Sequence, residues 1–497
     1  MTDLELLPQQ ALQRNLFGTD GIRGEATLEP GNGLINPQTF AGLGYAFVEE
    51  LKENGHTGDI RVVIGRDPRR HSDIFAKATM CGVIAAGGYV IDADILPTPG
   101  VQRIAQQERD VDGAIIITAS HNPPKDLGGK YTDKAFKLSE ERGLDMSNRL
   151  WQHADNGLVI PNTLDLSRVE KRLDARETYI SEIVEKIQSI FGLNPLEGKL
   201  FVVDCANGAA MNISPEVFEQ LGAEVIRFGH DPKGDINDNC GSEHLGGLKA
   251  FLARNPKIAG RMIGAIAHDG DADRGNGVGY DDGEFLEITG NNILEAMAEY
   301  PKQPGVAGTI YINTATERRI RAMKQEDGTP VGFKYCKNGD TQVTRTLLDE
   351  QALGRLWTRG AERTAHSMFT DDWLTSGDGT FSMAWYACWA VTVKKATFGE
   401  IARAAPMWPT EEITIPTKGL PIPEDIGEHP EVLAAIEKEL QELGGDGRVV
   451  LRPSGTEPKM RGMMEVPIGA TSRDKMVQSI QRLGERAMTV AAELVAA

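Results

Sequence analysis

The chain has 497 residues, of which 40% are hydrophobic and 25% are charged, as is typical of a globular protein with several domains. It carries 72 acidic and 53 basic residues, and the formal net charge of −19 argues against a surface that attracts nucleic acid or anionic membranes. A phosphate ligand would therefore have to be held by local cationic loops or by a metal ion.

The cysteines and the apolar segments indicate the cellular compartment of the protein. The five cysteines are scattered and lack CxxC spacing, so neither a disulfide framework nor a zinc site is expected. The N-terminus has no basic segment followed by an apolar core, which argues against a signal peptide. The longest apolar stretch, residues 383–393, is too short to span a bilayer. We therefore predict a cytoplasmic protein.

The first part of the chain alternates strands and helices, which is typical of a parallel α/β sheet. Residues 1–14 have the character of a loose polar extension. Three glycines around Arg23 then indicate either a surface turn or a loop that lets backbone approach a ligand. Strands are predicted at 61–64 and 89–95, on either side of a helix over 72–86.

An apolar run at 113–117 predicts a strand buried on both faces, followed by Thr-Ala-Ser-His-Asn-Pro-Pro. Asn122 and the prolines end regular structure, so Ser120 is expected on a loop at the carboxyl end of the strand. Open α/β sheets bind ligands at that edge. Ser120 is therefore a candidate nucleophile, although the Ser-His-Asn-Pro sequence alone is also compatible with an ordinary turn.

Two further α/β segments follow, each with strands that run into polar turns. The predicted elements of the second segment are a helix at 180–190, a helix at 215–221, a strand that runs into a turn over 200–208, and strands at 224–228 and 262–267. Those of the third are a helix at 293–298 and strands at 309–312 and 331–335, with loops at 360–366 and 375–379.

The last part of the chain has a different character. Prolines between 406 and 423 indicate a linker. A helix over 432–443 ends at two glycines, two short strands surround 452–458, and a long helix begins near Asp474. This pattern predicts a small α+β domain.

Asp269, Asp271 and Asp273 alternate with small residues directly after the strand at 262–267. Carboxylates at every second position can converge on one hard cation. An EF-hand is excluded because Arg274 and Tyr280 stand where that loop needs glycine and glutamate. A solvated acidic turn is the alternative, but three like charges beside a buried strand repel one another unless a cation joins them. We expect Mg²⁺, held by the three carboxylates and a phosphoryl oxygen.

The segment Arg-Pro-Ser-Gly-Thr-Glu-Pro at 452–458, with Arg461 beyond it, has the composition of an anion cradle. Arginine can grip phosphate through two parallel hydrogen bonds, and Ser454, Thr456 and backbone amides can add donors. By itself, Pro-Ser-Gly-Thr is more often a plain turn.

Two other enzyme classes are disfavoured. The sequence at 128–130 lacks the upstream glycine of a Walker A loop, and a tyrosine replaces its Ser or Thr. A serine hydrolase is unexpected because Ser120 and His121 are adjacent, and neighbouring extended residues point to opposite sides.

Taken together, four stretches resemble the signatures of the α-D-phosphohexomutase superfamily, and the resemblance extends from Phe17 to the C-terminal helix. The stretches, in order, are 118–123, 269–274, 360–366 and 452–458. Among the branches of the family, the sequence is most similar to the phosphoglucosamine mutases in three segments: 17–24, 204–209 and 237–244.

The resemblance implies an α/β fold of three similar domains with mixed sheets, and a C-terminal α+β domain, around a central cleft. The implied domains carry, in order, the phosphoserine, metal-binding, sugar-binding and phosphate-binding loops: 1–172, 173–283, 284–405 and 406–497.

The resemblance also implies a role for each site residue. Ser120 would carry the phosphoryl group and contact Mg²⁺ together with Asp269, Asp271 and Asp273. The remaining catalytic candidates are Lys130, which would assist proton transfer, Arg23, which would lie near the phosphoserine, and His121. The candidates for binding the sugar and its second phosphate are Glu362, Thr364, His366, Arg274, Arg452, Ser454, Gly455, Thr456 and Arg461.

Three departures from the family pattern stand out. Leu127 replaces the usual asparagine before the catalytic lysine, and Lys137 is a rival to Lys130 for that role. In the sugar loop, Ala365 replaces glycine and gives up its freedom at positive φ. The usual Val-Gly-Asp is Asn-Gly-Asp at 338–340.

The implied activity is that of an isomerase that interconverts glucosamine 6-phosphate and glucosamine 1-phosphate through a phosphoserine and a 1,6-bisphosphate, and feeds cell-wall precursor synthesis. Lys130 or His366 would accept the hydroxyl proton. The alternatives are the same chemistry on mannose or glucose phosphates, and a catalytically silent relative that binds sugar phosphates. The expected partners are small hexose or hexosamine phosphates, without nucleic acid or membrane, for a monomer or homodimer.

Overall fold

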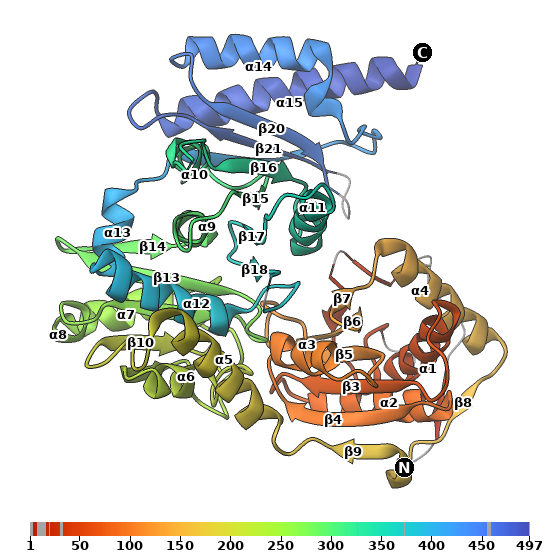
Figure 1. The fold of residues 1–497 in the computed structure, drawn as a ribbon. Helices are drawn as coiled ribbons and strands as arrows, with labels where there is room; N and C mark the ends of the chain where they lie inside the picture. The colour runs from red at the N-terminus through yellow and green to blue at the C-terminus, as the bar shows by residue number, and fades with distance from the viewer. Residues whose placement is uncertain are drawn as a thin grey trace. The chain divides into compact units, whose positions relative to one another are not determined.

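The structure, a computed structural model, describes residues 3–6, 16–18, 20–29, 33–325, 327–371, 373–454 and 459–496. Contacts divide it into two compact units (Figure 1). Unit 1 comprises Met1–Thr309 with Cys336–Ala404, and unit 2 comprises Ile310–Tyr335 with Ala405–Ala497. The predicted fold class is confirmed, because several mixed α/β sheets precede a C-terminal α+β part. The predicted domain boundaries stay predictions.

The first sheet of unit 1 has the strand order β2-β6-β5-β3-β4-β9, with β7 paired to β6. The pairs β3–β4, β3–β5 and β4–β9 are parallel, whereas β6 runs antiparallel to both β2 and β5. Its strands are β2 (Ile22–Glu25), β3 (Arg61–Arg66), β4 (Tyr89–Ile95), β5 (Gly113–Ile117), β6 (Asp126–Asp133), β7 (Phe136–Lys137) and β9 (Val169–Lys171). The helices around it are α1 (Pro37–Glu53), α2 (Ser72–Ala85), α3 (Thr98–Gln107) and α4 (Glu140–Asp155).

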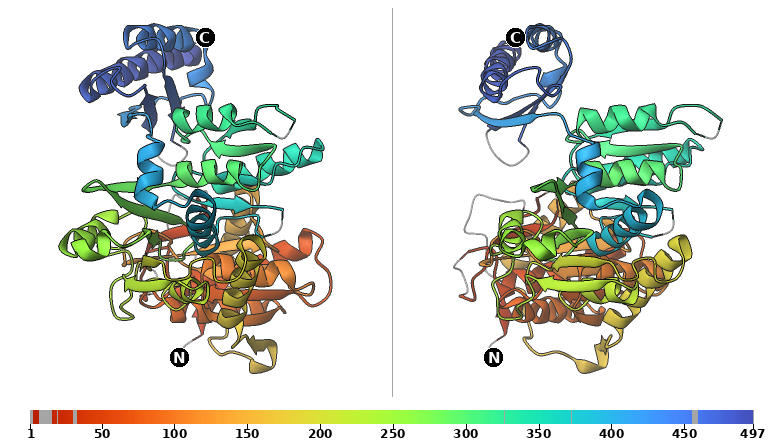
Figure 2. Two further views of the ribbon diagram at one scale, coloured as in Figure 1. Left: turned by 60° about the vertical axis from the view of Figure 1, so that its left-hand side comes forward. Right: turned by 90° about the vertical axis from the view of Figure 1, so that its left-hand side faces the viewer.

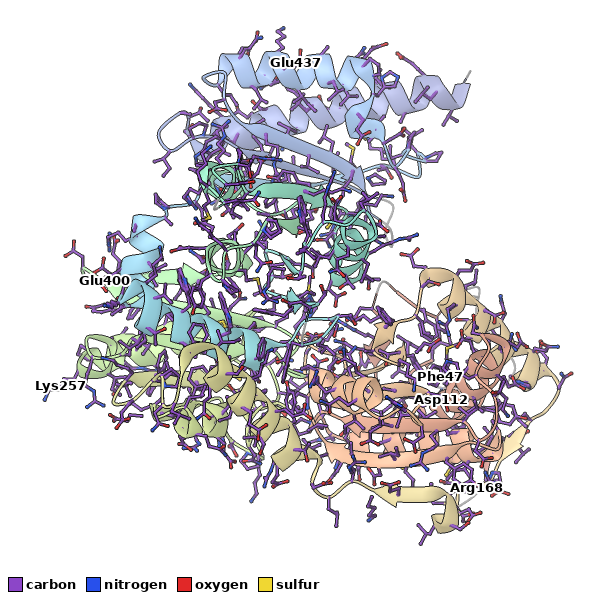
Figure 3. All side chains as sticks on the ribbon, in the orientation of Figure 1. Phe47, Asp112, Arg168, Lys257, Glu400 and Glu437 are labelled. Atoms are coloured by element: carbon purple, nitrogen blue, oxygen red, sulfur yellow. The ribbon has the colours of Figure 1, made fainter. Side chains whose placement is uncertain are left out.

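The central strands follow the expected pattern. Every residue of β5 is buried, as predicted for a strand covered on both faces. Phe47 of α1 is fully buried among these helices and packs against Tyr131 of β6, with ring centroids 5.5 Å apart, whereas Lys257 projects into solvent at the edge of unit 1 (Figure 3). The predicted strands at 61–64 and 89–95 and the helix at 72–86 are confirmed.

Helices α1 and α2 pack backbone to backbone through glycines. A Cβ on Gly82 would lie 1.9 Å from Ala41 O, and one on Gly44 would lie 2.4 Å from Thr79 O. Gly82→Ala should therefore force the helices apart and lower the free energy of unfolding by about 2–3 kcal/mol. The matched control is Gly246→Ala, because a Cβ there meets nothing within 4 Å.

Thermal unfolding of both variants tests this packing. Gly246→Ala should keep or slightly raise the midpoint, since alanine is the better helix former by about 0.5–1 kcal/mol. An unfolding midpoint for Gly82→Ala equal to that of Gly246→Ala would contradict the close approach of the two helices.

The second sheet of unit 1 has the order β11-β10-β12-β13-β14. Strands β10, β11 and β12 are parallel, and β13 and β14 return antiparallel. Its strands are β10 (Leu200–Asp204), β11 (Glu224–Phe228), β12 (Gly264–His268), β13 (Gly275–Asp281) and β14 (Glu284–Ile288). The accompanying helices are α5 (Ala175–Phe191), α6 (Ser214–Gln220), α7 (Leu245–Arg254) and α8 (Pro256–Ala259).

A third group of strands in unit 1 pairs β15 parallel to β17, and β17 antiparallel to β18. Its elements are β15 (Gly305–Thr309), β17 (Arg359–Ala361), β18 (Ser367–Phe369), α9 (Gly290–Glu299), α11 (Asp340–Ala352), α12 (Gly379–Trp389) and α13 (Phe398–Ala404).

Unit 2 is built on an antiparallel sheet of order β19-β21-β20, and helices α14 and α15 lie side by side against it (Figures 1 and 2). Its elements are β19 (Thr410–Pro416), α14 (Pro430–Glu442), β20 (Arg448–Pro453), β21 (Lys459–Glu465) and α15 (Arg473–Ala496), together with α10 (Thr314–Ala322) and the greater part of β16 (Gly332–Cys336).

Three predictions of local structure are wrong. Residues 4–5 form strand β1 (Leu4–Glu5), which pairs with β8 (Val159–Ile160), so the N-terminal segment is not wholly a loose extension. The strand predicted at 309–312 lies earlier, as β15, and the predicted linker at 406–423 contains β19. Across the described ranges, no helix combines the length and apolarity needed to cross a membrane.

Candidate active site

Ser120 lies where the sequence predicts it, on the loop after β5. It is 1% exposed and adopts a left-handed backbone with φ of 52°. Its amide donates to Thr118 Oγ1 at 2.8 Å, and its Oγ donates to Asp269 Oδ2 at 2.7 Å. Because Asp269 follows β12, this contact joins the edges of the first two sheets of unit 1 at the nucleophile candidate.

The three aspartates follow β12 on a tight loop whose Ala272 has φ of 56°. Asp269, Asp271 and Asp273 are buried, and one oxygen from each lies within 4.8 Å of the others. Burial, and then Asp273 and Asp271, raises the pKa of Asp269 to about 8. Asp271 Oδ1 is buried and has no hydrogen-bond partner among the described residues. An orphaned oxygen and crowded carboxylates are what a hard cation would satisfy, so the residues fit a divalent metal ion.

Lys130 on β6 and Lys137 on β7 both lie beside this cluster, but on different partners. Lys130 Nζ lies 2.8 Å from Asp271 Oδ2 and 3.2 Å from Asp20 Oδ2, and it also pairs with Asp273. Lys137 Nζ lies 2.7 Å from both Asp20 Oδ1 and Asp340 Oδ2. Although burial disfavours its charged form, the carboxylates around Lys130 hold its pKa well above the usual range.

Asp20 joins these cations to the glycine-rich segment. Its carboxylate contacts Lys130 and Lys137 and accepts a 2.6 Å hydrogen bond from Arg23 Nη2. Despite burial, Lys130, Lys137 and Arg23 keep the pKa of Asp20 well below its ordinary value. Arg23 therefore lies in the charged network around Lys130, whereas the position near the phosphoserine that the resemblance implies for it stays a prediction.

His121 follows the nucleophile candidate directly. Its Nδ1 lies 3.3 Å from Ser120 Oγ. Burial, and then Arg274 and Arg23, lowers the pKa of His121 to about 3, so the imidazole is neutral at physiological pH. Arg274 Nη1 donates to Glu243 Oε1 at 2.6 Å, and its amide donates to Asp269 Oδ1 at 3.2 Å.

The sugar loop joins β17 to β18. His366 Nε2 lies 3.0 Å from Asp273 Oδ1, and His366 Nδ1 lies 2.5 Å from Glu362 Oε2. Burial alone would lower the pKa of His366, but Asp273 and Glu362 raise it to about 10, so the ring is a cation. Ala365 is buried and has φ of 67°, which confirms that this position requires the conformation that glycine adopts more easily.

Both proposed proton acceptors carry a positive charge. Lys130 and His366 are both cations in this structure, and a cation donates a proton before it can accept one. Glu362 Oε1 also accepts from Gly339 N at 2.9 Å, so its oxygens already have partners. Thr364 is half-buried on the same loop.

Unit 2 holds the arginines of the predicted phosphate cradle. Arg452 on β20 and Arg461 on β21 are directly opposed in the strand register. Like charges placed opposite each other destabilise a sheet unless an anion joins them. Arg452 Nε donates to Tyr311 Oη at 2.9 Å, and Ser454 N donates to Lys459 O at 2.8 Å. Gly455 and Thr456 lie outside the described residues.

Sequence reasoning missed several residues that surround Ser120. Arg69 donates to Ser120 O at 2.6 Å, and Asn237 Nδ2 donates to the same oxygen at 2.8 Å. Asp67 accepts from Thr118 Oγ1 at 2.7 Å. The position of Asp67 and Arg69 just after β3, beside β5 in the sheet, was a signal that could have been used. Asn237 begins the segment 237–244 that resembles the phosphoglucosamine mutases, but that resemblance assigned it no role.

Comparison with known proteins gives consistent matches. Residues 14–152 match the family described as phosphoglucomutase/phosphomannomutase, alpha/beta/alpha domain I, and 418–480 match its C-terminal domain. The chain is 33% identical to the phosphoglucosamine mutase of Corynebacterium diphtheriae over 469 residues, covering 92% of this chain and 96% of that protein. The corresponding protein of Thermobifida fusca is 33% identical over 475 residues, covering 95% and 97%.

Solved structures show the same fold at lower identity. A phosphoglucomutase/phosphomannomutase family protein from Burkholderia thailandensis superposes with a TM-score of 0.72 at 21% identity, covering 97% of this chain and 98% of that one. The Aspergillus fumigatus N-acetylphosphoglucosamine mutase, solved in complex with GlcNAc-6P and magnesium, has a TM-score of 0.58 at 15% identity, covering 88% and 84%.

Proposed function

The chain belongs to the α-D-phosphohexomutase superfamily of isomerases, and on that premise we propose that it interconverts glucosamine 6-phosphate and glucosamine 1-phosphate. The observation that carries this proposal is the 2.7 Å hydrogen bond from Ser120 Oγ to Asp269 in a buried aspartate cluster. The choice of glucosamine is supported by the relatives at 33% identity, which are named phosphoglucosamine mutases.

In the proposed reaction, the phosphoryl group of phospho-Ser120 passes to the free hydroxyl of a hexosamine monophosphate and gives a 1,6-bisphosphate. The other phosphate then returns to Ser120. Lys130 and His366, held as cations, can protonate the departing serine oxygen. Taking the proton from the sugar hydroxyl requires that one of them first loses its aspartate partners, because burial then lowers its pKa.

Asp269, Asp271 and Asp273 would hold Mg²⁺, with Ser120 beside them. The bound ion would neutralise charge on the phosphoryl oxygens as they transfer. A relative solved with magnesium supports this choice of metal. Lys130, which contacts Asp271, is better placed than Lys137 for the family's lysine role.

A direct test combines mass spectrometry with a coupled assay. The intact protein should carry one phosphate on Ser120, or acquire it from glucosamine 1,6-bisphosphate. Turnover of glucosamine 6-phosphate should exceed that of mannose and glucose 6-phosphates. Faster turnover of mannose or glucose phosphate would assign the chain to that activity instead. Absence of both phosphoserine and isomerase activity would leave a sugar-phosphate-binding relative.

The cradle arginines should act on binding rather than on chemistry. We expect Tyr311→Phe to raise KM about fivefold and to leave kcat nearly unchanged, since the lost hydrogen bond orients the Arg452 guanidinium for the non-reacting phosphate. The matched control is Tyr335→Phe, because the Tyr335 ring packs on Arg448, 4.4 Å from its guanidinium carbon and outside the predicted cradle. Equal KM values for the two variants would contradict this role of Tyr311.

A further inference from the structure

The backbone of the loop that carries Ser120 is held by the side chain of Arg69, which the proposed chemistry does not use. The side chain of Arg69 has 0% exposure, and its Nε donates to the equally buried Asp67 at 3.0 Å. Its two terminal nitrogens donate to four backbone carbonyls, those of Ser120 (2.6 Å), Asn122 (2.9 Å) and Pro123 (2.6 Å) on the loop and that of Asp126 (3.0 Å) at the start of β6. A buried guanidinium that donates hydrogen bonds to several carbonyl oxygens fixes the path of the backbone.

Asn237 reaches the same loop from a different part of unit 1. Its Nδ2 donates to Ser120 O at 2.8 Å and to Asn122 O at 3.1 Å. Its own amide donates to Ala206 O at 2.9 Å, which ties it to the loop after β10. Since β10 pairs with β12, and β12 leads to Asp269, Asn237 links the nucleophile loop to the sheet that carries the aspartates.

The conformation that these side chains hold is an unfavourable one. A residue with a Cβ in the left-handed region, as Ser120 is at φ of 52°, costs about 1–2 kcal/mol and persists only where its surroundings impose it. Here the peptide of Ser120 points its carbonyl at Arg69 and Asn237 while Oγ points at Asp269. Released from these donors, the backbone could relax and swing Oγ away from the aspartates.

We propose that Arg69 and Asn237 form a carbonyl clamp that keeps Ser120 left-handed and sets the distance from its Oγ to the aspartate cluster. Both are positioning residues, because they contact loop carbonyls and not the reacting atoms. The effect on rate rests on the proposed function of Ser120, whereas the effect on backbone geometry does not. A misplacement of about 1 Å can cost about a hundredfold in rate, so the clamp should act on kcat.

Asn237→Ala tests the clamp, and Asn239→Ala is its matched control. Asn239 has φ of 53° on the same loop, is exposed, and donates its side chain to Asp238. Both substitutions place alanine where a left-handed asparagine stood, so the conformational free-energy cost of the two changes should be similar. Only Asn237→Ala removes a hydrogen-bond donor to Ser120.

The expected result is a rate difference between the two variants. For Asn237→Ala, the single-turnover rate of phosphoryl transfer from the phosphorylated enzyme to glucosamine 6-phosphate should fall about tenfold or more. The steady-state KM of this variant should change less than about threefold. Asn239→Ala should stay within about twofold of the wild type. Equal rates for the two variants would overturn the clamp.

Crystal structures of the wild type and Asn237→Ala give a readout that needs no turnover. We expect Ser120 to leave the left-handed region in the variant, or its Oγ to move beyond hydrogen-bond reach of Asp269, about 3.5 Å. A variant in which Ser120 keeps its φ near 52° and its contact with Asp269 would overturn the clamp, whatever the enzyme turns over. A wild-type protein without phosphoserine and mutase activity would instead refute the proposed function, and the crystal comparison would still decide the clamp.

Discussion

Ser120→Ala should abolish mutase turnover and leave the fold intact. Deleting a nucleophile that no neighbour can replace lowers kcat by about 10⁴ to 10⁶ in other enzymes, and we expect a loss of that order here. The fold should survive because the donors to the Ser120 carbonyl, Arg69 and Asn237, act on backbone that alanine retains. The lost hydrogen bond to Asp269 should cost only about 1–2 kcal/mol of stability.

The coupled assay, thermal unfolding and mass spectrometry together check this result. Ser147→Ala is a suitable control, since Ser147 is also fully buried and its Oγ donates to Gly143 O at 3.0 Å within α4. It should lose comparable stability but keep its activity and its phosphoserine. A Ser120→Ala protein with more than about 1% of wild-type turnover would show that another group carries the phosphoryl group.

The features of the site that the sequence predicts are those that depend on residues within one continuous stretch. An unbroken apolar run identified β5, and turn-forming residues after it placed Ser120 at the strand end. Aspartates at every second position after β12 likewise predicted convergence, and the structure brings Asp269, Asp271 and Asp273 together. In both cases local pattern and tertiary position agree, because a parallel sheet collects its carboxyl ends on one edge.

The part of the carbonyl clamp that Asn237 contributes could not be predicted in this way. Asn237 lies 117 positions from Ser120, and no property of an asparagine on a loop reveals which carbonyl it will meet. Likewise, the pairing of Lys137 with both Asp20 and Asp340 depends on elements from separate α/β segments. Such contacts follow from the packing of elements, which a single sequence does not specify.

The misplaced strand at 309–312 has a different cause. Its β-branched and aromatic residues have high strand propensity, whereas β15 contains two glycines, which are usually depleted in strands. Tertiary packing decides in favour of β15. A Cβ on Gly305 would lie 2.0 Å from the Trp357 ring, and β15 pairs with β17 beside it. A similar override explains β19, an edge strand in the order β19-β21-β20 that tolerates Pro416 at its end.

Removal of divalent metal should inactivate the enzyme and make its stability depend on the protonation of the aspartate cluster. We expect chelation to lower turnover by about a thousandfold or more, and added Mg²⁺ to restore it. The pKa of Asp269, raised to about 8 by burial and by Asp273 and Asp271, also predicts the pH dependence of stability without metal. The folded state keeps a proton that the unfolded state releases above about pH 4, so the free energy of unfolding should fall as pH rises from about 4 to about 8.

Mg²⁺ requires the ionised carboxylate, so below about pH 8 it must displace that proton, and its affinity should rise with pH. The increase in unfolding midpoint on adding Mg²⁺ to chelated protein should therefore be larger near pH 8.5 than near pH 6. Asp271→Asn removes one of the charges that raise the pKa of Asp269 and one of the ligands, so it should weaken both the pH dependence and the response to Mg²⁺. A stabilisation by Mg²⁺ that is equal in the variant and the wild type, or greater at the lower pH, would place the cation somewhere other than on these three aspartates.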